Sequence, residues 1–211
     1  MKRLAILGAS GHGKVVADTA ECCGWDKIEF FDDAWPSCSE NGNWPVKGTT
    51  KELIEQINNF DGIAVAIGNN AVRQEKISLI TQMGGRLPSI IHPMAYVSRH
   101  AFIGHGTVVF AGAVVNAGAK IASGGILNTG CSVDHDCILD EAVHISPGAR
   151  LAGGVVVGAR TWVGIAACIK QLVCLGADVT VGAGAAVIRS VAEKNTVVGV
   201  PADLIESRGD K

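Results

Sequence analysis

The stretch VSRHAFIGHGTVVFAGAVV, residues 97–115, places an aliphatic residue at every sixth position. The same period continues without a break to residue 187, and the positions that keep it are Val97, Ile103, Val109, Val115, Ile121, Leu127, Val133, Leu139, Ile145, Leu151, Val157, Val163, Ile169, Leu175, Val181 and Val187. Four residues after each of them stands a small or β-branched residue, such as Ala113, Cys131 or Val143. A fixed period of this kind is typical of a repeat architecture.

One aliphatic and one small residue per six fit the inside of a triangular prism built from short parallel strands. Three six-residue faces then make one coil, and glycine suits many corners because turns often need positive φ. We therefore expect residues 93–211 to form an all-β parallel β-helix with a C-terminal tail. A β-sandwich with accidental periodicity is the competing interpretation.

Residues 1–92 alternate apolar runs with helical spacing, which predicts an α/β domain of Rossmann type with a parallel sheet. The expected strands are 2–7, 28–31, 63–67 and 87–91, and the expected helices are 14–23, 50–59 and 71–83. Thr49 or Thr50 is the expected cap of the second helix. Residues 33–48 read as an irregular loop, and the sequence assigns no role to them.

Composition narrows the function classes. The formal net charge of −2 gives no basic surplus for nucleic acid. No apolar run reaches the roughly 18 to 20 residues of a membrane span. Seven cysteines without a CxxC pair predict reduced thiols and hence a cytoplasmic protein.

The turn GASGHG at residues 8–13 follows the first expected strand. It departs from the dinucleotide pattern GxGxxG in its glycine spacing. It also matches GxxxxGK, but Val15 stands where a nucleotide-hydrolysing P-loop needs Ser or Thr. A glycine turn whose N–H groups hold a pyrophosphate at a helix N-terminus is the favoured reading, and a tight turn without a ligand is the alternative.

Polar residues end the next two strands at the same sheet edge, which faces the ligand crevice in open α/β sheets. Asp32 and Asp33 follow one strand, and Gly68-Asn69-Asn70 follows the other. A carboxylate there can accept hydrogen bonds from a uracil or ribose. Capping of a loop is the alternative role.

These motifs together carry a resemblance. GASGHG, the Asp-Asp strand end, IGNN at 67–70, ILNT at 126–129 and the VxHxC run at 133–137 resemble the bacterial sugar O/N-acyltransferases of the NeuD/PglD type. The similarity covers about residues 3–205. It is strongest to members that N-acetylate a UDP-linked amino-dideoxy sugar for protein glycosylation.

The resemblance implies a left-handed coil, acetyl-CoA as co-substrate, a UDP-sugar acceptor, no metal, and a homotrimer with active sites between neighbouring prisms. It implies His135 as general base with Asp136 behind it, although relatives usually have Glu there. The substrate residues it implies are Ser10, Gly11, His12, Asp32, Asp33, Gly68 and Asn128. The residues it implies for acetyl-CoA are His144, Gly153, Ile165 and Ala183, where relatives have Gly at the last position.

The chemistry of acetyl transfer suits these residues. A histidine takes the proton from the attacking amine, and an adjacent carboxylate fixes its tautomer. A backbone N–H, which we expect at Gly153, stabilises the oxyanion. Direct attack on the thioester needs no covalent enzyme intermediate.

The sequence is also compatible with three other functions. O-acetylation of a sialic-acid-like sugar needs the same base. Zinc carbonic-anhydrase activity would draw ligands from His100, His105, His135 and His144 across a trimer interface, which metal analysis would reveal. A non-catalytic nucleotide-sugar-binding protein is the third. As part of a larger fused protein, the chain would work at the inner face of a membrane.

Overall fold

The computed structural model describes residues 1–205. The N-terminal domain has a three-stranded parallel sheet in the order β2-β1-β5, formed by β1 (Arg3–Leu7), β2 (Lys27–Phe31) and β5 (Gly62–Val65). Its helices are α1 (Gly11–Cys22), α2 (Thr50–Glu55) and α3 (Asn70–Gln82), with a 3₁₀ turn η1 (Ile57–Asn59). Both faces of the sheet are buried, as the near-continuous apolar strands require.

The second helix is shorter than expected. The second helix ends at Glu55, and the chain continues as η1 instead of reaching residue 59 in one helix. Thr49 is its N-cap, and Glu52 completes a capping box. The segment 33–48 contains a short antiparallel hairpin, β3 (Glu40–Asn41) and β4 (Trp44–Pro45), which the sequence analysis missed.

The expected strand at 87–91 is wrong as a fourth strand of the N-terminal sheet. Only Ile90–Ile91 forms a strand, β6, and it pairs in parallel with β9 (Val108–Val109) of the β-helix. The first coil therefore begins before residue 93. An apolar run predicts a buried strand, but it does not say which of two adjacent sheets receives it.

The β-helix has three faces of short strands, each of two residues except β23 with three, and the faces are numbered in the order in which the chain visits them. The first face carries β6, β9, β12 (Ile126–Leu127), β15 (His144–Ile145), β18 (Trp162–Val163), β21 (Thr180–Val181), β23 (Thr196–Val198) and the antiparallel end strand β24 (Asp203–Leu204). The second face carries β7 (Tyr96–Val97), β10 (Val114–Val115), β13 (Ser132–Val133), β16 (Arg150–Leu151), β19 (Cys168–Ile169) and β22 (Ala186–Val187). The third face carries β8 (Phe102–Ile103), β11 (Lys120–Ile121), β14 (Ile138–Leu139), β17 (Val156–Val157) and β20 (Cys174–Leu175).

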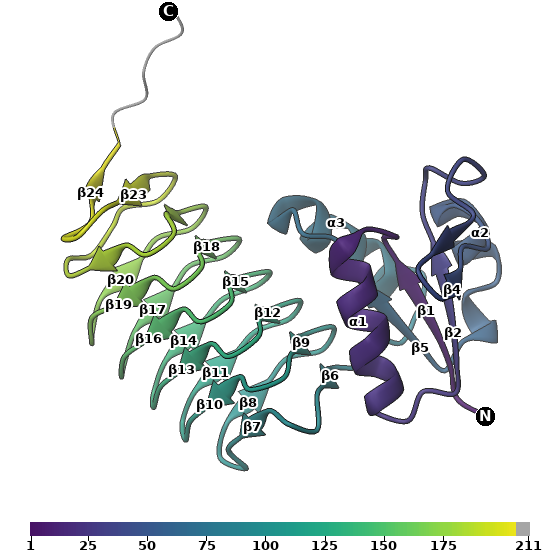
Figure 1. Ribbon diagram of the computed structural model, residues 1–211, viewed down its shortest axis with the longest axis horizontal. Coiled ribbons are helices and arrows are strands. Elements are labelled where there is room, and N and C mark those ends of the chain that lie inside the picture. The colour runs from purple at the N-terminus through teal and green to yellow at the C-terminus, as the bar shows by residue number, and fades with distance from the viewer. Residues whose placement is uncertain (206–211) are drawn as a thin grey trace, which may run out of the picture.

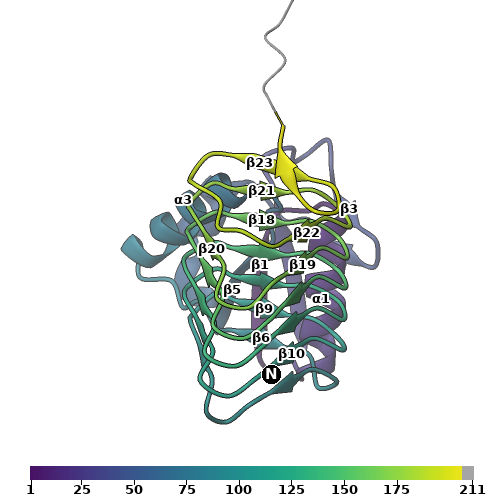
Figure 2. The same ribbon diagram turned by 90° about the vertical axis from the view of Figure 1, so that its left-hand side faces the viewer.

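The repeat residues fill the prism as predicted. The aliphatic column and the small-residue register together make its core, from Val109 to Val197. Neighbouring coils are 18 residues apart and pair in register, so that Val115 lies beside Val133 and Val133 beside Leu151. Figure 2 shows the coils stacked one above the other. We call the turns that follow first-, second- and third-face strands the first, second and third corners.

The two domains share a packed seam. Figure 1 shows the N-terminal domain against the first face of the prism. The outward side chains of Val108 and Ile126 on that face pack with Val16 and Ala20 of α1 in one buried cluster. The nucleotide-binding candidates and the prism are therefore held in a fixed relation.

Arg73 of α3 crosses this seam. It is 1 % exposed, and it donates to the carbonyls of Ile67 and Gly68 and to Asn70 Oδ1 in its own domain. On the prism it donates to the carbonyls of Gly124 and Ala142, at two successive third corners. No carboxylate among residues 1–205 pairs with it. Burial lowers the pKa of Arg73 to about 10, so the guanidinium stays charged near neutral pH.

None of the helices within residues 1–205 is long and apolar enough to span a bilayer. The same residues contain no group of three or more His, Cys, Asp or Glu side chains arranged to hold a metal ion. All seven cysteines are free thiols.

Candidate active site

His135 lies where the six-residue period predicts, outside the prism at a second corner. Val133 and Cys137 point inward on either side of it and are fully buried, whereas the His135 side chain is 64 % exposed. Asp136 occupies the left-handed region at φ 59°, a conformation that Asp tolerates better than most residues. In this tight turn Asp136 Oδ2 comes within 2.9 Å of His135 Nδ1.

This contact sets the proton positions on His135. The hydrogen bond to Asp136 raises the pKa of His135, the negative charges of Asp134 and Asp136 add to the effect, and desolvation opposes it. A carboxylate on Nδ1 favours the tautomer with the proton there. Nε2 is left as the free base nitrogen, and it points away from Asp136. The pair therefore has the arrangement of a general base with an orienting acid.

Gly153 lies directly beneath the imidazole, one coil further along. It is buried, and a Cβ placed on it would lie 2.4 Å from His135 Nε2 and 2.5 Å from Cε1. Within residues 1–205 no acceptor takes the Gly153 N–H, although its carbonyl accepts from Leu172. A glycine here leaves room for the imidazole, and its unused N–H is available as a donor to an oxyanion formed beside the base.

Replacing Gly153 by Ala tests this close approach. Its φ lies outside the left-handed region, so Ala fits the backbone and the fold should persist. The new methyl group would push the exposed imidazole from its position. A displacement of about 1 Å can cost about a hundredfold in rate, and we expect a loss of that order in kcat with unchanged thermal unfolding. Unchanged kcat would contradict the contact.

Replacing Asp136 by Asn tests the pKa and the tautomer together. Loss of the carboxylate removes the interaction that raises the pKa of His135, so that pKa falls. Because the neutral ring is the active base, the acidic limb of the kcat/KM profile should move to lower pH. The plateau rate should drop about ten- to a hundredfold, less than for a buried triad because water replaces the partner. A limb that moves to higher pH, or stays in place, would contradict this assignment.

A second group of candidate residues meets on the first face. Asn128 Nδ2 lies 3.2 Å from His144 Nε2, and the His144 ring stacks on Trp162 with centroids 5.8 Å apart. Trp162 in turn donates from Nε1 to Ser146 Oγ. A cavity of about 550 Å³ opens beside His144 and Trp162, and its lining also includes Gly68. The structure thus brings Gly68 of the N-terminal domain and His144 of the prism to one hollow.

Two histidines at the seam are held neutral. Burial lowers the pKa of His144 to about 3, and the charges of Arg73 and His12 contribute. Burial likewise lowers the pKa of His12 to about 4, with a further contribution from Arg73. His12 packs edge-on against Phe110, and its Nε2 is buried without a hydrogen-bond partner in the described chain. An unpaired buried nitrogen of this kind suits a polar ligand.

Asp32 and Asp33 have partners within the protein. Asp32 Oδ2 accepts from the Ala9 N–H at 2.7 Å, and Oδ1 accepts from the Ala34 N–H. Asp33 Oδ1 accepts from the N–H of Thr50, a bond that lowers the pKa of Asp33, and Lys76 lies 3.6 Å from Oδ2. Both carboxylates therefore perform the loop-capping role that the sequence left as the alternative. The Asp33 side chain is also 62 % exposed, so a ligand can reach it.

The candidate residues for acetyl-CoA do not all meet within one chain. Ile165 and Ala183 are exposed at the first corner on successive coils, joined by a bond from the Gly184 N–H to the Ile165 carbonyl. Gly153 and His135 lie at the second corner. Sequence reasoning missed Trp162 and Arg73, because neither belongs to a motif that singles it out.

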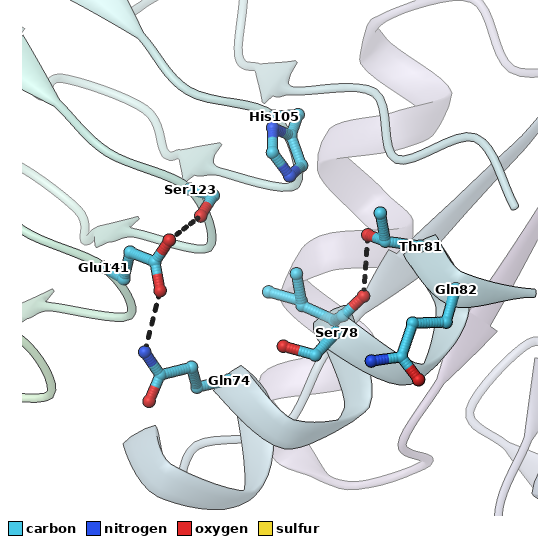
Figure 3. Close-up of a pocket in the computed structure, with 8 residues that line it drawn as sticks. Gln74, Ser78, Thr81, Gln82, His105, Ser123 and Glu141 are labelled. Atoms are coloured by element: carbon cyan, nitrogen blue, oxygen red, sulfur yellow. Dashed lines mark hydrogen bonds between the residues drawn. The ribbon is translucent and has the colours of Figure 1, made fainter. Parts of the chain in front are cut away.

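A smaller hollow of about 280 Å³ separates α3 from the third corner (Figure 3). Gln74 donates to Glu141 across it, and Ser123 donates to the other carboxylate oxygen. Its further lining includes His105 and Thr81. His105 is one of the histidines considered above as zinc ligands, but none of the residues predicted for acetyl transfer lines this hollow, so it is separate from the candidate active site.

Known proteins resemble this chain in both domains. Residues 3–80 match the PglD N-terminal domain family. The acetyltransferase domain of PglB from Neisseria gonorrhoeae is 42 % identical, with 97 % of this chain and 100 % of that one covered at a TM-score of 0.92. The chain belongs to the PglD/NeuD-type family of sugar N-acetyltransferases. Its β-helix is accordingly the left-handed parallel form of that family.

The names of two further relatives mention a ligand or a substrate. PerB from Caulobacter crescentus, solved with CoA and GDP-perosamine, is 36 % identical over 98 % of both chains at a TM-score of 0.93. UDP-N-acetylbacillosamine N-acetyltransferase of Bacillus subtilis is 36 % identical over 115 residues. That alignment spans about half of the curated relative, 51 % of its length, and 52 % of this chain.

Proposed function

We propose that this chain transfers the acetyl group of acetyl-CoA to the amino group of a UDP-linked amino-dideoxy sugar. The observation that carries the proposal is the His135–Asp136 pair seated over Gly153, in a chain whose full length resembles an acetyltransferase domain solved with acetyl coenzyme A. His135 Nε2 takes a proton as the amine attacks the thioester carbonyl. The tetrahedral oxyanion accepts from the Gly153 N–H. Its collapse breaks the C–S bond, and the CoA thiolate takes the proton held by His135 and leaves as the thiol.

We further propose that the active site lies between copies in a homotrimer. Within one chain His135 occupies a second corner, whereas Asn128, His144 and Gly68 gather on the first face and its corner. A neighbouring copy that presents its second corner to this hollow would complete the site. The third face supports assembly because its outward side chains include the exposed apolar residues Phe102 (62 %), Ile138 (48 %) and Val156 (37 %).

The N-terminal domain would hold the nucleotide diphosphate at the glycine turn. Ser10 caps α1, Gly11 and His12 begin it, and Asp32 at the end of β2 accepts from the Ala9 N–H of the same turn. Asn128 would contact the sugar, and Gly68 would lie near the nucleotide. The donor would contact His144 and run past Ile165 and Ala183, where its backbone contacts are independent of the side chain at 183. We expect this protein to work in the cytoplasm.

A thiol-release assay tests the activity. Acetyl-CoA is offered with UDP-linked 4-amino-4,6-dideoxy sugars, with GDP-perosamine, and with free sialic acids. Release with a UDP-amino sugar and a product heavier by one acetyl group support the proposal. Release only with sialic acids would replace N-acetylation by O-acetylation, and release with none would remove the proposed activity. Sedimentation of the purified protein tests the trimer separately.

A further inference from the structure

The hairpin in residues 33–48 packs against β2 and α1, the two elements that flank the glycine turn. Val46 bridges to Phe30 of β2, and the Lys47 N–H donates to the Phe30 carbonyl at 2.8 Å. Trp44 Nε1 donates to Glu21 Oε1 of α1 at 2.8 Å. The hairpin is therefore held by both the sheet and the helix that flank the turn.

Asn41, the last residue of β3, is the polar side chain that the hairpin directs into this space. It is only 5 % exposed, and its Nδ2 donates to the Ser10 carbonyl at 3.1 Å. Ser10 is the N-cap of α1, and its own hydroxyl makes no capping bond. On the other side of the turn, the Ala9 N–H donates to Asp32. The peptide groups flanking residues 9 and 10 are thus fixed by two side chains from different elements.

The packing beneath the turn leaves Asn41 little freedom. A Cβ on Gly13 would lie 2.4 Å from the Gly8 carbonyl oxygen, 2.9 Å from Phe30 and 3.3 Å from Asn41 Nδ2. The Asn41 amide therefore packs against the first turn of α1 as well as bonding to its cap. A shorter or charged side chain at position 41 would change the position of that first turn.

The position of this first turn matters for the backbone N–H groups at the start of α1. Among residues 1–205 no acceptor takes the N–H groups of Gly11, His12 or Gly13, and the first helical bond runs from Lys14 to Ser10. These N–H groups gain their direction from the conformation at Ser10. A bound diphosphate requires them to converge, so the fixing of the Ser10 carbonyl bears directly on anion affinity.

We propose that Asn41 is a positioning residue for the nucleotide diphosphate: by holding the Ser10 carbonyl it aims the first N–H groups of α1 at the bound phosphates. The inference rests on the proposed function, because it assumes a nucleoside diphosphate in this turn. Asn41 itself does not touch the reacting atoms. The role of the hairpin is then to place the Asn41 side chain at the glycine turn, where its amide bonds to the Ser10 carbonyl.

The test compares Asn41→Leu and Asn41→Asp with Asn43→Leu and Asn43→Asp. Leu keeps the volume and removes the donor, and Asp turns an acceptor and a charge toward the Ser10 carbonyl and the phosphates. Asn43 is exposed in the same hairpin and serves as the matched control. Calorimetry with UDP and separately with CoA gives the two dissociation constants, and steady-state assays give KM and kcat.

We expect Asn41→Leu to raise the dissociation constant for UDP and the KM for the nucleotide sugar about tenfold, the scale of one lost hydrogen bond. Asn41→Asp should raise both further. The dissociation constant for CoA and kcat should not change, and both Asn43 variants should match wild type. Wild-type UDP affinity in both Asn41 variants would overturn the inference. So would an equal loss of UDP and CoA affinity, which indicates general unfolding.

The outcomes also separate this inference from the proposed function. A wild-type protein that binds UDP but acetylates no sugar contradicts the proposed function, while the UDP comparison still decides the role of Asn41. A wild-type protein that binds no UDP overturns both.

Discussion

His135→Gln should lower kcat/KM for the acceptor sugar about 10²- to 10⁴-fold, the usual contribution of a general base. Gln keeps much of the size and polarity of the ring but cannot take a proton near neutral pH. At about 1.4 kcal/mol per factor of ten, the loss corresponds to about 3 to 5 kcal/mol of transition-state stabilisation. The dissociation constant for CoA should stay within about twofold, because the donor contacts proposed here lie mainly on other residues.

His100→Gln is the matched control, because His100 is an exposed histidine at the same second corner of the prism. Its replacement should leave both kcat/KM and CoA affinity at the wild-type value. Steady-state thiol release and CoA calorimetry provide the measurements. Turnover of His135→Gln within a few-fold of wild type would remove His135 as the base, and it would leave the fold and the family assignment unaffected.

Arg73→Met should produce the largest loss of stability among single substitutions at the seam. Met nearly matches the length of the Arg side chain, but it leaves the carbonyls of Gly124 and Ala142 buried without their donor. Hydrogen bonds from a charged group are worth about 1.5 to 3 kcal/mol each, and an orphaned buried carbonyl costs about 1 to 3 kcal/mol. Relief from burying the cation offsets part of this. We expect a net loss of about 3 kcal/mol in the free energy of unfolding.

Arg160→Met provides the comparison. Arg160 also lies at the seam, where it pairs with Asp178 and donates to Gln74, but its side chain is 29 % exposed. Partly exposed pairs contribute about 1 kcal/mol or less. Urea unfolding followed by circular dichroism measures both variants. If Arg73→Met and Arg160→Met lost equal stability, the buried network would not hold the domains together in the manner described.

The apolar patterns of residues 1–92 predicted the three strands of the N-terminal sheet and its three helices, because each of these elements has its own spacing of apolar residues. The limits of that approach show at Ile90–Ile91. The two residues are apolar enough for either sheet, and only their pairing with Val108–Val109 assigns them to the prism. The hairpin at 40–45 was missed for a related reason, since two-residue strands are too short to show alternation.

For His135 too, the sequence predicted part of the geometry and the tertiary structure supplied the rest. The period of six identified which residues face inward, and therefore predicted that His135 projects outward at a corner. It did not predict the positive φ at Asp136 that carries the carboxylate to Nδ1, nor the closeness of Gly153 to Nε2. Those distances depend on how one corner turns and how the next coil sits beneath it.

The amino-acid order alone determined the prism, the α/β character of the first 92 residues, and the outward placement of the histidine. These follow from local periodicity, because burial of one side of a strand or helix repeats at a fixed interval along the chain. Only the tertiary structure decided three other features. These are the hydrogen bonds of Arg73 between the two domains, the hydrogen bond from Asn41 to Ser10, and the cavity that Gly68 and His144 both line. Each brings together residues from different elements that no period relates, so their proximity arises only when the separately patterned units pack together.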